Sequence, residues 1–217
     1  MLLLAIDTST AWTSVAVLRD GEPVADAAEL ATNRHGDLLA PLLTAVLRDA
    51  GSQPGELTAV AAGVGPGPFT GLRVGMATAA ALGHACGIPV HGVVSHDAIA
   101  AATGGPVVAV TDARRREVYW ARYDEQLRRV EGPEVTTAAV LAGRLTAAGY
   151  AGPLAGPGVE LYPDALAGWL HKDAGHPAAV WIGRLAVAGH TVPLVPRYLR
   201  RPDAVEPGPR RPALPRR

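Results

Sequence analysis

The sequence predicts an α/β protein made of two similar halves, each with a mixed sheet flanked by helices. Apolar runs bounded by polar turns alternate with segments whose apolar residues recur at helical spacing, as in a chain of strands and helices. The strand end Ala5-Ile6-Asp7 has a counterpart at Val110-Thr111-Asp112, which favours a duplicated unit over a chance match. With 217 residues, 48% of them hydrophobic, the chain can bury a sizeable core.

The first half opens with three predicted strands. Residues 2–6 and 13–18 are almost wholly apolar, which is typical of strands buried on both faces of a sheet. The polar turn Asp7-Thr8-Ser9-Thr10 separates them. The pair Asp20-Gly21 then predicts a hairpin into a third strand at residues 23–30.

A helix is predicted at residues 37–50. Its apolar residues form a broad stripe with a 3.6-residue period, made of Leu38, Leu39, Leu42, Leu43, Val46, Leu47 and Ala50. Pro41 falls in the first turn, where a missing N–H costs little, and Gly51 ends the helix.

The rest of the first half alternates between strands and helices. A strand is expected at 59–64, followed by the glycine-rich loop 65–71 and a helix at 72–86 made mostly of Ala and Gly. A further strand at 90–94 and a short helix at 97–102 complete this half.

The second half repeats the opening pattern. Strands are predicted at 107–111 and 117–123, and helices at 136–148 and 177–188. We expect an N-terminal subdomain at residues 1–103 that carries the interface helices and a C-terminal subdomain at 104–199. A disordered tail at 200–217 is expected, because its Arg and Pro residues cannot form a core.

Composition and spacing exclude several classes of protein. Twenty basic and twenty acidic residues cancel, so no overall charge attracts nucleic acid or anionic lipid. The single cysteine, Cys86, excludes a disulfide framework, and no two histidines stand three or four residues apart as in a helical metal site. The apolar runs are shorter than a membrane span, and residues 1–6 lack the features of a secretory leader. We therefore expect a cytoplasmic protein with no membrane partner.

Two turns are candidates for phosphate binding. Asp7, Thr8, Ser9 and Thr10 resemble the first phosphate loop of actin-like ATPases, although a plain hairpin turn has the same composition. The matching turn of the second half, residues 112–116, carries three arginines where close approach to a nucleotide needs small residues. ATP hydrolysis by this chain alone is therefore not expected.

The glycine-rich loop and the helix after it leave two readings open. Pro66 and Pro68 remove amides that a phosphate nest would use, which favours a rigid, shaped loop. In the helix, Gly75, Ala79 and Gly83 form a smooth face that packs either on the chain's own sheet or on another subunit.

Four segments, in this order, resemble the TsaB (YeaZ) family of bacterial accessory subunits for the tRNA modification threonylcarbamoyladenosine. They are Ile6-Asp7-Thr8-Ser9-Thr10, residues 63–75, residues 112–119 and Pro196-Arg197-Tyr198-Leu199-Arg200. Together they cover the chain from Leu2 to about Arg200. Pro68 departs from the family loop, which usually has Ser at this place.

The resemblance implies an actin-like (ASKHA) fold in two subdomains and a subunit that is not an enzyme. It implies an accessory role in transferring a threonylcarbamoyl group to N6 of the adenosine 3′ of the anticodon, in tRNAs reading codons that begin with A. This chain would stabilise and position the catalytic TsaD-type partner. The alternative is a stand-alone actin-like ATPase or small-molecule kinase. In that case Asp7 to Thr10 would form the nucleotide site.

The resemblance also implies partners and an interface. A TsaE-type ATPase, tRNA through the complex and, in the absence of TsaD, a second copy of the chain are expected. No cofactor is expected for this subunit, and ATP and a metal ion are expected for the partner subunits. The family pairs through its two N-terminal helices, which places the interface on Leu38, Leu39, Leu42, Val46, Arg73, Gly75, Met76, Ala79 and Gly83.

Overall fold

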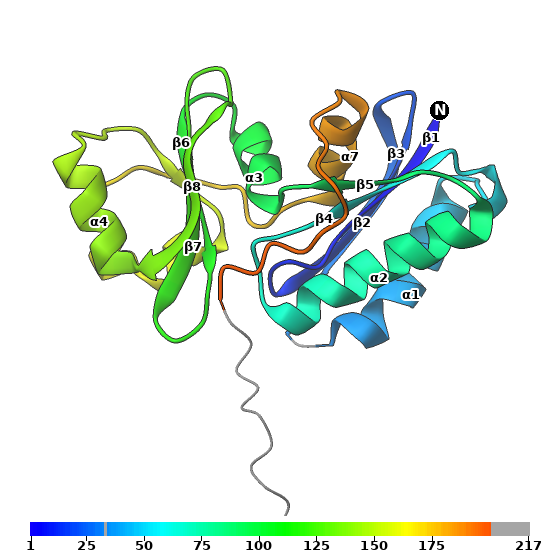
Figure 1. Cartoon of the computed structure of the whole chain (residues 1–217), viewed down its shortest axis with the longest axis horizontal. Coiled ribbons are helices and arrows are strands. Elements are labelled where there is room, and N and C mark those ends of the chain that lie inside the picture. The colour runs from blue at the N-terminus through cyan, green and yellow to red at the C-terminus, as the bar shows by residue number, and fades with distance from the viewer. Residues whose placement is uncertain (33, 201–217) are drawn as a thin grey trace, which may run out of the picture.

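The computed structural model describes residues 1–32 and 34–200 and contains two five-stranded sheets side by side (Figure 1). The first sheet has the order β3-β2-β1-β4-β5 and the second the order β10-β9-β6-β7-β8. The strands of the first sheet are β1 (Leu2–Asp7), β2 (Trp12–Arg19), β3 (Glu22–Leu30), β4 (Ala59–Gly63) and β5 (Val90–Val93). Those of the second sheet are β6 (Val107–Asp112), β7 (Glu117–Tyr123), β8 (Arg129–Thr137), β9 (Leu154–Ala155) and β10 (His171–Lys172).

The two sheets are paired in the same way. In the first, β1 is antiparallel to β2 on one side and parallel to β4 on the other. In the second, β6 is antiparallel to β7 and parallel to β9. Strand β6 therefore occupies the place of β1, as the sequence repeat predicted, and both sheets are mixed.

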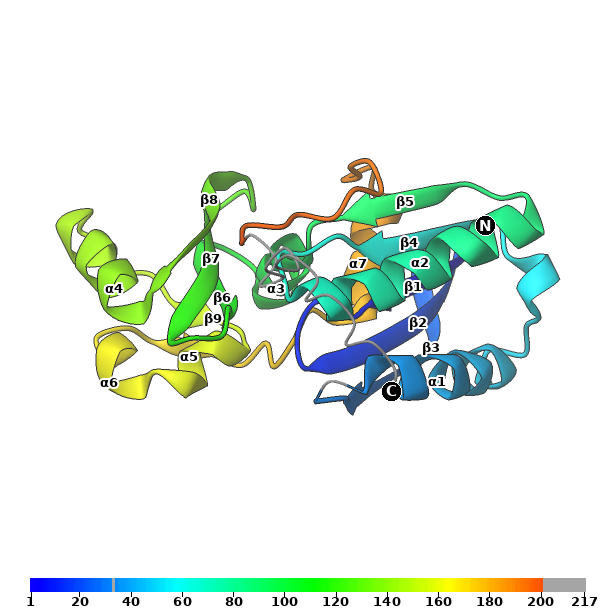
Figure 2. The ribbon, with the colours of Figure 1, turned by 60° about the horizontal axis from the view of Figure 1, so that its bottom comes forward.

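Helices cover both faces of the first sheet. Helices α1 (His35–Asp49) and α2 (Phe69–Cys86) lie on one face, and α7 (Ala179–Val187) lies on the other (Figures 1 and 2). Strand β1 is buried between them: Leu4 and Ile6 face the α1 side, and Leu3 and Ala5 face the α7 side. This explains the continuous apolar run, because alternate residues enter different cores.

Helix α3 (Ser95–Thr103) links the sheets, and short elements surround the second sheet. The second core contains Trp120 and Leu141, packed under α4 (Ala138–Ala147). The remaining elements are η1 (Pro54–Glu56), α5 (Pro157–Leu161) and α6 (Pro163–Leu166). No helix in the described part of the chain is long and apolar enough to span a membrane.

The chain returns to the first sheet after it has completed the second. Ala179 and Ile182 of α7 pack against the α7 side of the first core, and Val192 pairs with Gly92 at the edge of the sheet. A division at residue 103 would therefore assign α7 to the second half, although α7 covers the first sheet. The predicted tail begins at Arg200, whose position is described, and the rest of it lies outside the described residues.

Most predicted elements are confirmed within a few residues, and three differences have a clear cause. Helix α2 begins at Phe69 rather than residue 72, because Pro68 stands directly before it as the N-cap. Strand β8 was not predicted, because charged residues and the Gly132-Pro133 pair interrupt its alternation. The helix predicted from residue 136 begins at Ala138, where the Thr137 side chain accepts a hydrogen bond from the Val140 N–H at 3.2 Å.

Candidate functional site

Asp7 lies at the end of β1, completely enclosed by the turn that follows and by α3. Its Oδ1 accepts hydrogen bonds from the Ser9 N–H at 2.8 Å and from the Ser9 hydroxyl at 2.7 Å. Its Oδ2 accepts one from the Ser95 hydroxyl at 2.7 Å. Burial raises the pKa of Asp7 to about 6, and the hydrogen bonds from Ser95 and Ser9 oppose that rise. Both carboxylate oxygens are therefore occupied within the chain.

Thr8 fixes the first turn to the start of α2. Its hydroxyl donates to the Gly71 carbonyl at 2.7 Å and accepts from the Gly75 N–H at 3.0 Å. A side chain at Gly75 would collide with the Thr8 hydroxyl, so this glycine permits the contact. Thr10 is also buried, and its hydroxyl accepts from the Trp12 N–H at 3.3 Å.

The glycine-rich loop is packed against the same turn. The Gly65 N–H donates to the Ser95 hydroxyl at 3.2 Å, and the Ser95 N–H donates to the Gly65 carbonyl at 2.9 Å. A Cβ at Gly67 would overlap the Ser9 carbonyl oxygen. The loop is thus held in one shape by close backbone contacts, which supports the prediction of a rigid loop over that of a phosphate nest.

The matching turn of the second half is exposed and left-handed. Arg114, Arg115 and Arg116 have φ values of 61°, 53° and 62°, a region that residues other than glycine rarely adopt. Asp112 accepts the Arg114 N–H at 2.8 Å, so its carboxylate stabilises the turn itself. The side chains of all three arginines are exposed.

A cavity of about 560 Å³ lies between the two turns and the ends of α1 and α2. Arg34 and Arg114 line it from different halves, together with Thr10, Phe69 and the buried His35. The His35 Nδ1 lies 2.8 Å from the Thr13 hydroxyl, and burial lowers its pKa. Among the described residues, no cluster of three His, Cys, Asp or Glu side chains could hold a metal ion.

Comparison with known proteins places this geometry in a family. A family model described as "TsaD: tRNA N6-adenosine threonylcarbamoyltransferase" matches residues 27–156. An uncharacterized protein of Mycobacterium tuberculosis is 46% identical over 210 residues, which cover 93% of each chain. The Escherichia coli "tRNA threonylcarbamoyladenosine biosynthesis protein TsaB" is 37% identical over 128 residues, covering 57% of this chain and about half (55%) of that protein.

Solved structures decide the assignment. A Pseudomonas aeruginosa protein with similarity to YeaZ superposes with a TM-score of 0.77 and 30% identity, covering 92% of this chain and 99% of that one. YeaZ from the same organism gives a TM-score of 0.75 at 29% identity, covering 91% of this chain and 99% of that one. The chain belongs to the TsaB/YeaZ family. The ethanolamine utilization protein EutJ, at 17% identity and a TM-score of 0.56, shares the fold alone, and the predicted actin-like α/β fold is confirmed.

In this TsaB/YeaZ family member, the residues predicted to form the partner interface are mostly inside the protein. Leu39, Leu42 and Val46 belong to the core of the first sheet, and Gly75 and its neighbours on α2 pack on β1 and β5. The buried members of the predicted set are Leu39, Leu42, Val46, Gly75, Met76, Ala79 and Gly83. Of the set, only Leu38 and Arg73 reach the surface, so the smooth face of α2 serves the chain's own sheet.

Sequence reasoning missed a cluster that joins the closing motif to α2. The Arg73 guanidinium lies 3.9 Å from the centre of the Phe69 ring and donates to the Tyr198 hydroxyl at 2.8 Å. Tyr198 and Phe69 also pack ring to ring, with centroids 5.0 Å apart. Arg200, two residues later, donates to the Ala113 carbonyl at 2.9 Å and pairs with Glu117. Residues 125 apart in sequence give no local pattern that could reveal these contacts.

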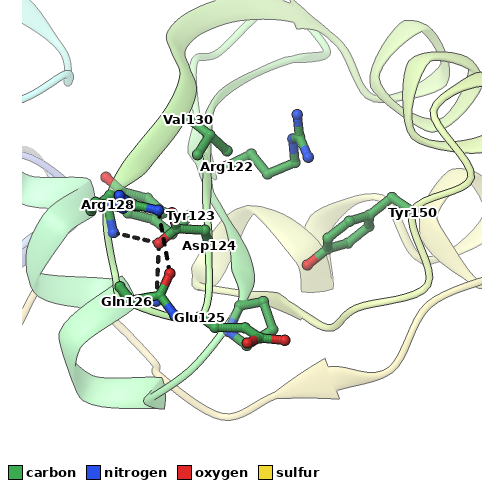
Figure 3. A pocket seen from close by; sticks show the side chains of 9 residues that line it. Arg122, Tyr123, Asp124, Glu125, Gln126, Arg128, Val130 and Tyr150 are labelled. Carbon is green, nitrogen blue, oxygen red and sulfur yellow. Dashed lines mark hydrogen bonds and ion pairs between the residues drawn. The ribbon is translucent and has the colours of Figure 1, made fainter.

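A second hollow of about 560 Å³ lies beside the β7–β8 hairpin (Figure 3). Three of its four charged side chains are paired within the hairpin: Asp124 accepts from Arg128, and Arg122 lies 3.2 Å from Glu131. The Tyr150 hydroxyl donates to the Pro153 carbonyl at 2.8 Å. No set of unpaired polar groups converges among these residues, so the cavity between the turns is the stronger candidate.

Proposed function

We propose that this chain is a non-catalytic accessory subunit in the biosynthesis of tRNA threonylcarbamoyladenosine, and that it stabilises and positions a TsaD-type catalytic partner. The E. coli relative is named for this pathway, and the matching family model is named for the transferase. The observation that carries the proposal is the first turn: Asp7, Thr8 and Ser9 are buried, and their polar atoms bind one another and the neighbouring loops. None of them presents a reactive group to a substrate.

The partner surface in this proposal is the exposed side of α1 and α2, which lie on one face of the first sheet (Figure 1). Four alanines lie on the exposed side of α2 together with Arg73 and His84, namely Ala77, Ala80, Ala81 and Ala85. Small residues allow a second helix to approach closely. Leu38 and Arg73 are the members of the predicted interface that are not buried, and Arg73 also contacts Phe69 and Tyr198.

The proposal includes the other components expected from the family. A TsaE-type ATPase joins the complex, tRNA is bound through the complex, and ATP and a metal ion belong to the partner subunits. Without the TsaD-type partner, the same alanine-rich surface pairs two copies of this chain.

The proposal is tested by co-purifying the chain with the TsaD-type protein of its host and assaying tRNA threonylcarbamoylation with and without the chain. We expect a stable complex and activity that depends on the chain. If the partner is fully active alone, and the chain instead binds ATP in a way that Asp7→Ala abolishes, the stand-alone ATPase is the better description.

A surface variant tests the docking face. Ala81→Arg places a long charged side chain on the exposed face of α2 and is expected to weaken the complex at least about tenfold, because a buried interface excludes an unpaired charge. Ala139→Arg makes the same change on the exposed face of α4 and is expected to leave affinity unchanged. Equal effects of the two variants, measured by titration calorimetry, would rule out this surface.

A further inference from the structure

Arginines from separate segments gather around the cavity between the two turns. Arg34 stands directly before α1, and Arg114 lines the same cavity from the second half. Arg115 and Arg116 continue the left-handed turn, and Arg200 reaches this turn through its hydrogen bond to the Ala113 carbonyl. We call these five residues, Arg34, Arg114, Arg115, Arg116 and Arg200, the basic rim.

The charge of the basic rim contrasts with that of the whole chain. The full sequence has twenty basic and twenty acidic residues, whereas the rim carries five arginines, and ion pairs within the described part of the chain join three of them to Asp37, Asp112 and Glu117. Arginines therefore outnumber these acidic partners at the rim. A local surplus of arginines attracts a polyanion even when the net charge is zero.

The backbone conformation at Arg114, Arg115 and Arg116 is unfavourable for any residue that has a side chain. A residue other than glycine is strained in the left-handed region because its Cβ crowds the following carbonyl oxygen, and the turn contains three such residues in succession. Strain of this kind is retained at functional sites when the side chain has a use that glycine cannot supply. The guanidinium group, a planar fork of N–H donors, matches the oxygens of a phosphate group.

We propose that the basic rim binds the phosphate backbone of RNA. The choice of RNA rests on the proposed function, in which tRNA is the molecule modified by the complex. A nucleotide offers the same phosphate chemistry, and an acidic protein surface offers the same charge. The rim spans two halves of the molecule and an exposed turn, which fits a long phosphate backbone better than the compact phosphates of one nucleotide.

The test measures the binding of unmodified tRNA to the full chain. Fluorescence anisotropy reports the binding at salt concentrations between about 0.05 M and about 0.2 M. The rim variant combines Arg34→Ala, Arg115→Gly and Arg116→Gly, because glycine suits the left-handed positions. The control variant combines Arg48→Ala, Arg144→Ala and Arg184→Ala, three arginines at the surface of α1, α4 and α7. Both variants remove three positive charges, so the net charge of the chain changes equally in the two.

We expect the rim variant to bind tRNA about tenfold or more weakly. We also expect the negative slope of the logarithm of the association constant against the logarithm of salt concentration to become shallower by about two, because direct phosphate contacts are lost. The control variant is expected to change affinity less than threefold. Equal losses in the two variants, or no binding of the wild-type chain at the lowest salt, would overturn the proposal.

Parallel measurements distinguish the other ligands. If the rim variant loses ADP or ATP binding and keeps tRNA binding, the rim serves a nucleotide. If it loses the TsaD-type partner and keeps tRNA binding, the rim serves a protein; either result overturns the RNA assignment. The dependence of threonylcarbamoylation on the wild-type chain is measured separately. The proposed function and the rim proposal can therefore fail independently of each other.

Discussion

The two halves of the molecule place a turn at the same position of each sheet, after β1 and after β6, yet the two turns have opposite properties. The first is buried, uncharged apart from Asp7, and bound on every side by hydroxyl and backbone groups. The second is exposed, carries three consecutive arginines and adopts a left-handed backbone. A repeated unit therefore preserves the strand pairing while the connecting turns diverge.

This difference shows which parts of the repeat the fold requires. The pairing of the central strands, Asp7 opposite Ser14 and Asp112 opposite Val118, is retained in both halves. The first turn is also a structural element, because it joins β1 to the glycine-rich loop, α2 and α3. The second turn encloses no buried carboxylate, and its arginines lie at the surface.

The largest expected effect comes from crowding the first turn. A Cβ at Gly63 would overlap Asp7 Oδ2 and approach the Ser95 hydroxyl to 2.8 Å. Because hydrogen bonds hold both of those groups in place, we expect Gly63→Ala to reduce the free energy of unfolding by about 3 kcal/mol or more. In thermal denaturation this corresponds to a fall in Tm of about 6–12 °C for a chain of this size.

The second half offers a matched control for that substitution. Gly143 lies within α4, is exposed, and has no atom near the place of an added Cβ. Gly143→Ala is expected to raise the free energy of unfolding by about 0.5–1 kcal/mol, because alanine favours the helix more than glycine does. If Gly63→Ala were as well tolerated as Gly143→Ala, the first turn would not be the close-packed structure described above.

The next effect concerns the charge of Asp7. Burial raises its pKa from 3.8 to about 6, so between about pH 4 and pH 6 the folded chain holds a proton that the unfolded chain releases. The contribution to stability is fully present below pH 3.8 and is lost as the pH rises through 6. The loss amounts to about 3 kcal/mol at neutral pH.

Asp7→Asn tests this directly, because an amide keeps the shape of the carboxylate and has no proton to lose. We expect the wild type to lose stability relative to this variant between pH 4 and pH 6, as measured by urea denaturation. The difference between the two proteins isolates Asp7, because His35, His96 and His176 have lowered pKa values and change stability in the opposite direction over this range. Asp112→Asn, in the corresponding turn, serves as the control and is expected to follow the pH profile of the wild type. A difference between wild type and Asp7→Asn that stays flat across this window would contradict the burial of the carboxylate.

Sequence patterns predicted the parts of this fold that local order determines. The apolar run of β1 and the leucine stripe of α1 identify their elements, because burial repeats with the period of a strand or a helix. The repeat at Asp112 located the second turn. Strand β8 was not predicted, because its half-buried positions Arg129 and Glu131 are charged and give no alternating apolar pattern.

The interface residues were harder to predict, for a physical reason. A helical stripe identifies which side chains are buried, and it is silent on whether the chain or another subunit buries them. Gly75 and Ala79 fit both readings in the sequence, and the structure assigns them to β1 and its turn. The contact of Arg73 with Tyr198 depends on the path of the chain after α7, which no local pattern contains.

The smallest expected effect on stability comes from replacing Arg116 in the second turn. Arg116 is exposed at a φ of 62°, where glycine avoids the strain that any side chain incurs, although glycine also gives the unfolded chain more freedom. The two effects nearly offset, so we expect Arg116→Gly to leave the free energy of unfolding unchanged or to raise it by up to about 1 kcal/mol in urea denaturation. Arg116→Ala retains the strain and is expected to be no more stable than the wild type. A loss above about 1 kcal/mol in Arg116→Gly would mean that this arginine stabilises the fold. A variant of equal or greater stability that binds RNA more weakly would show that the arginine is retained for binding rather than for stability.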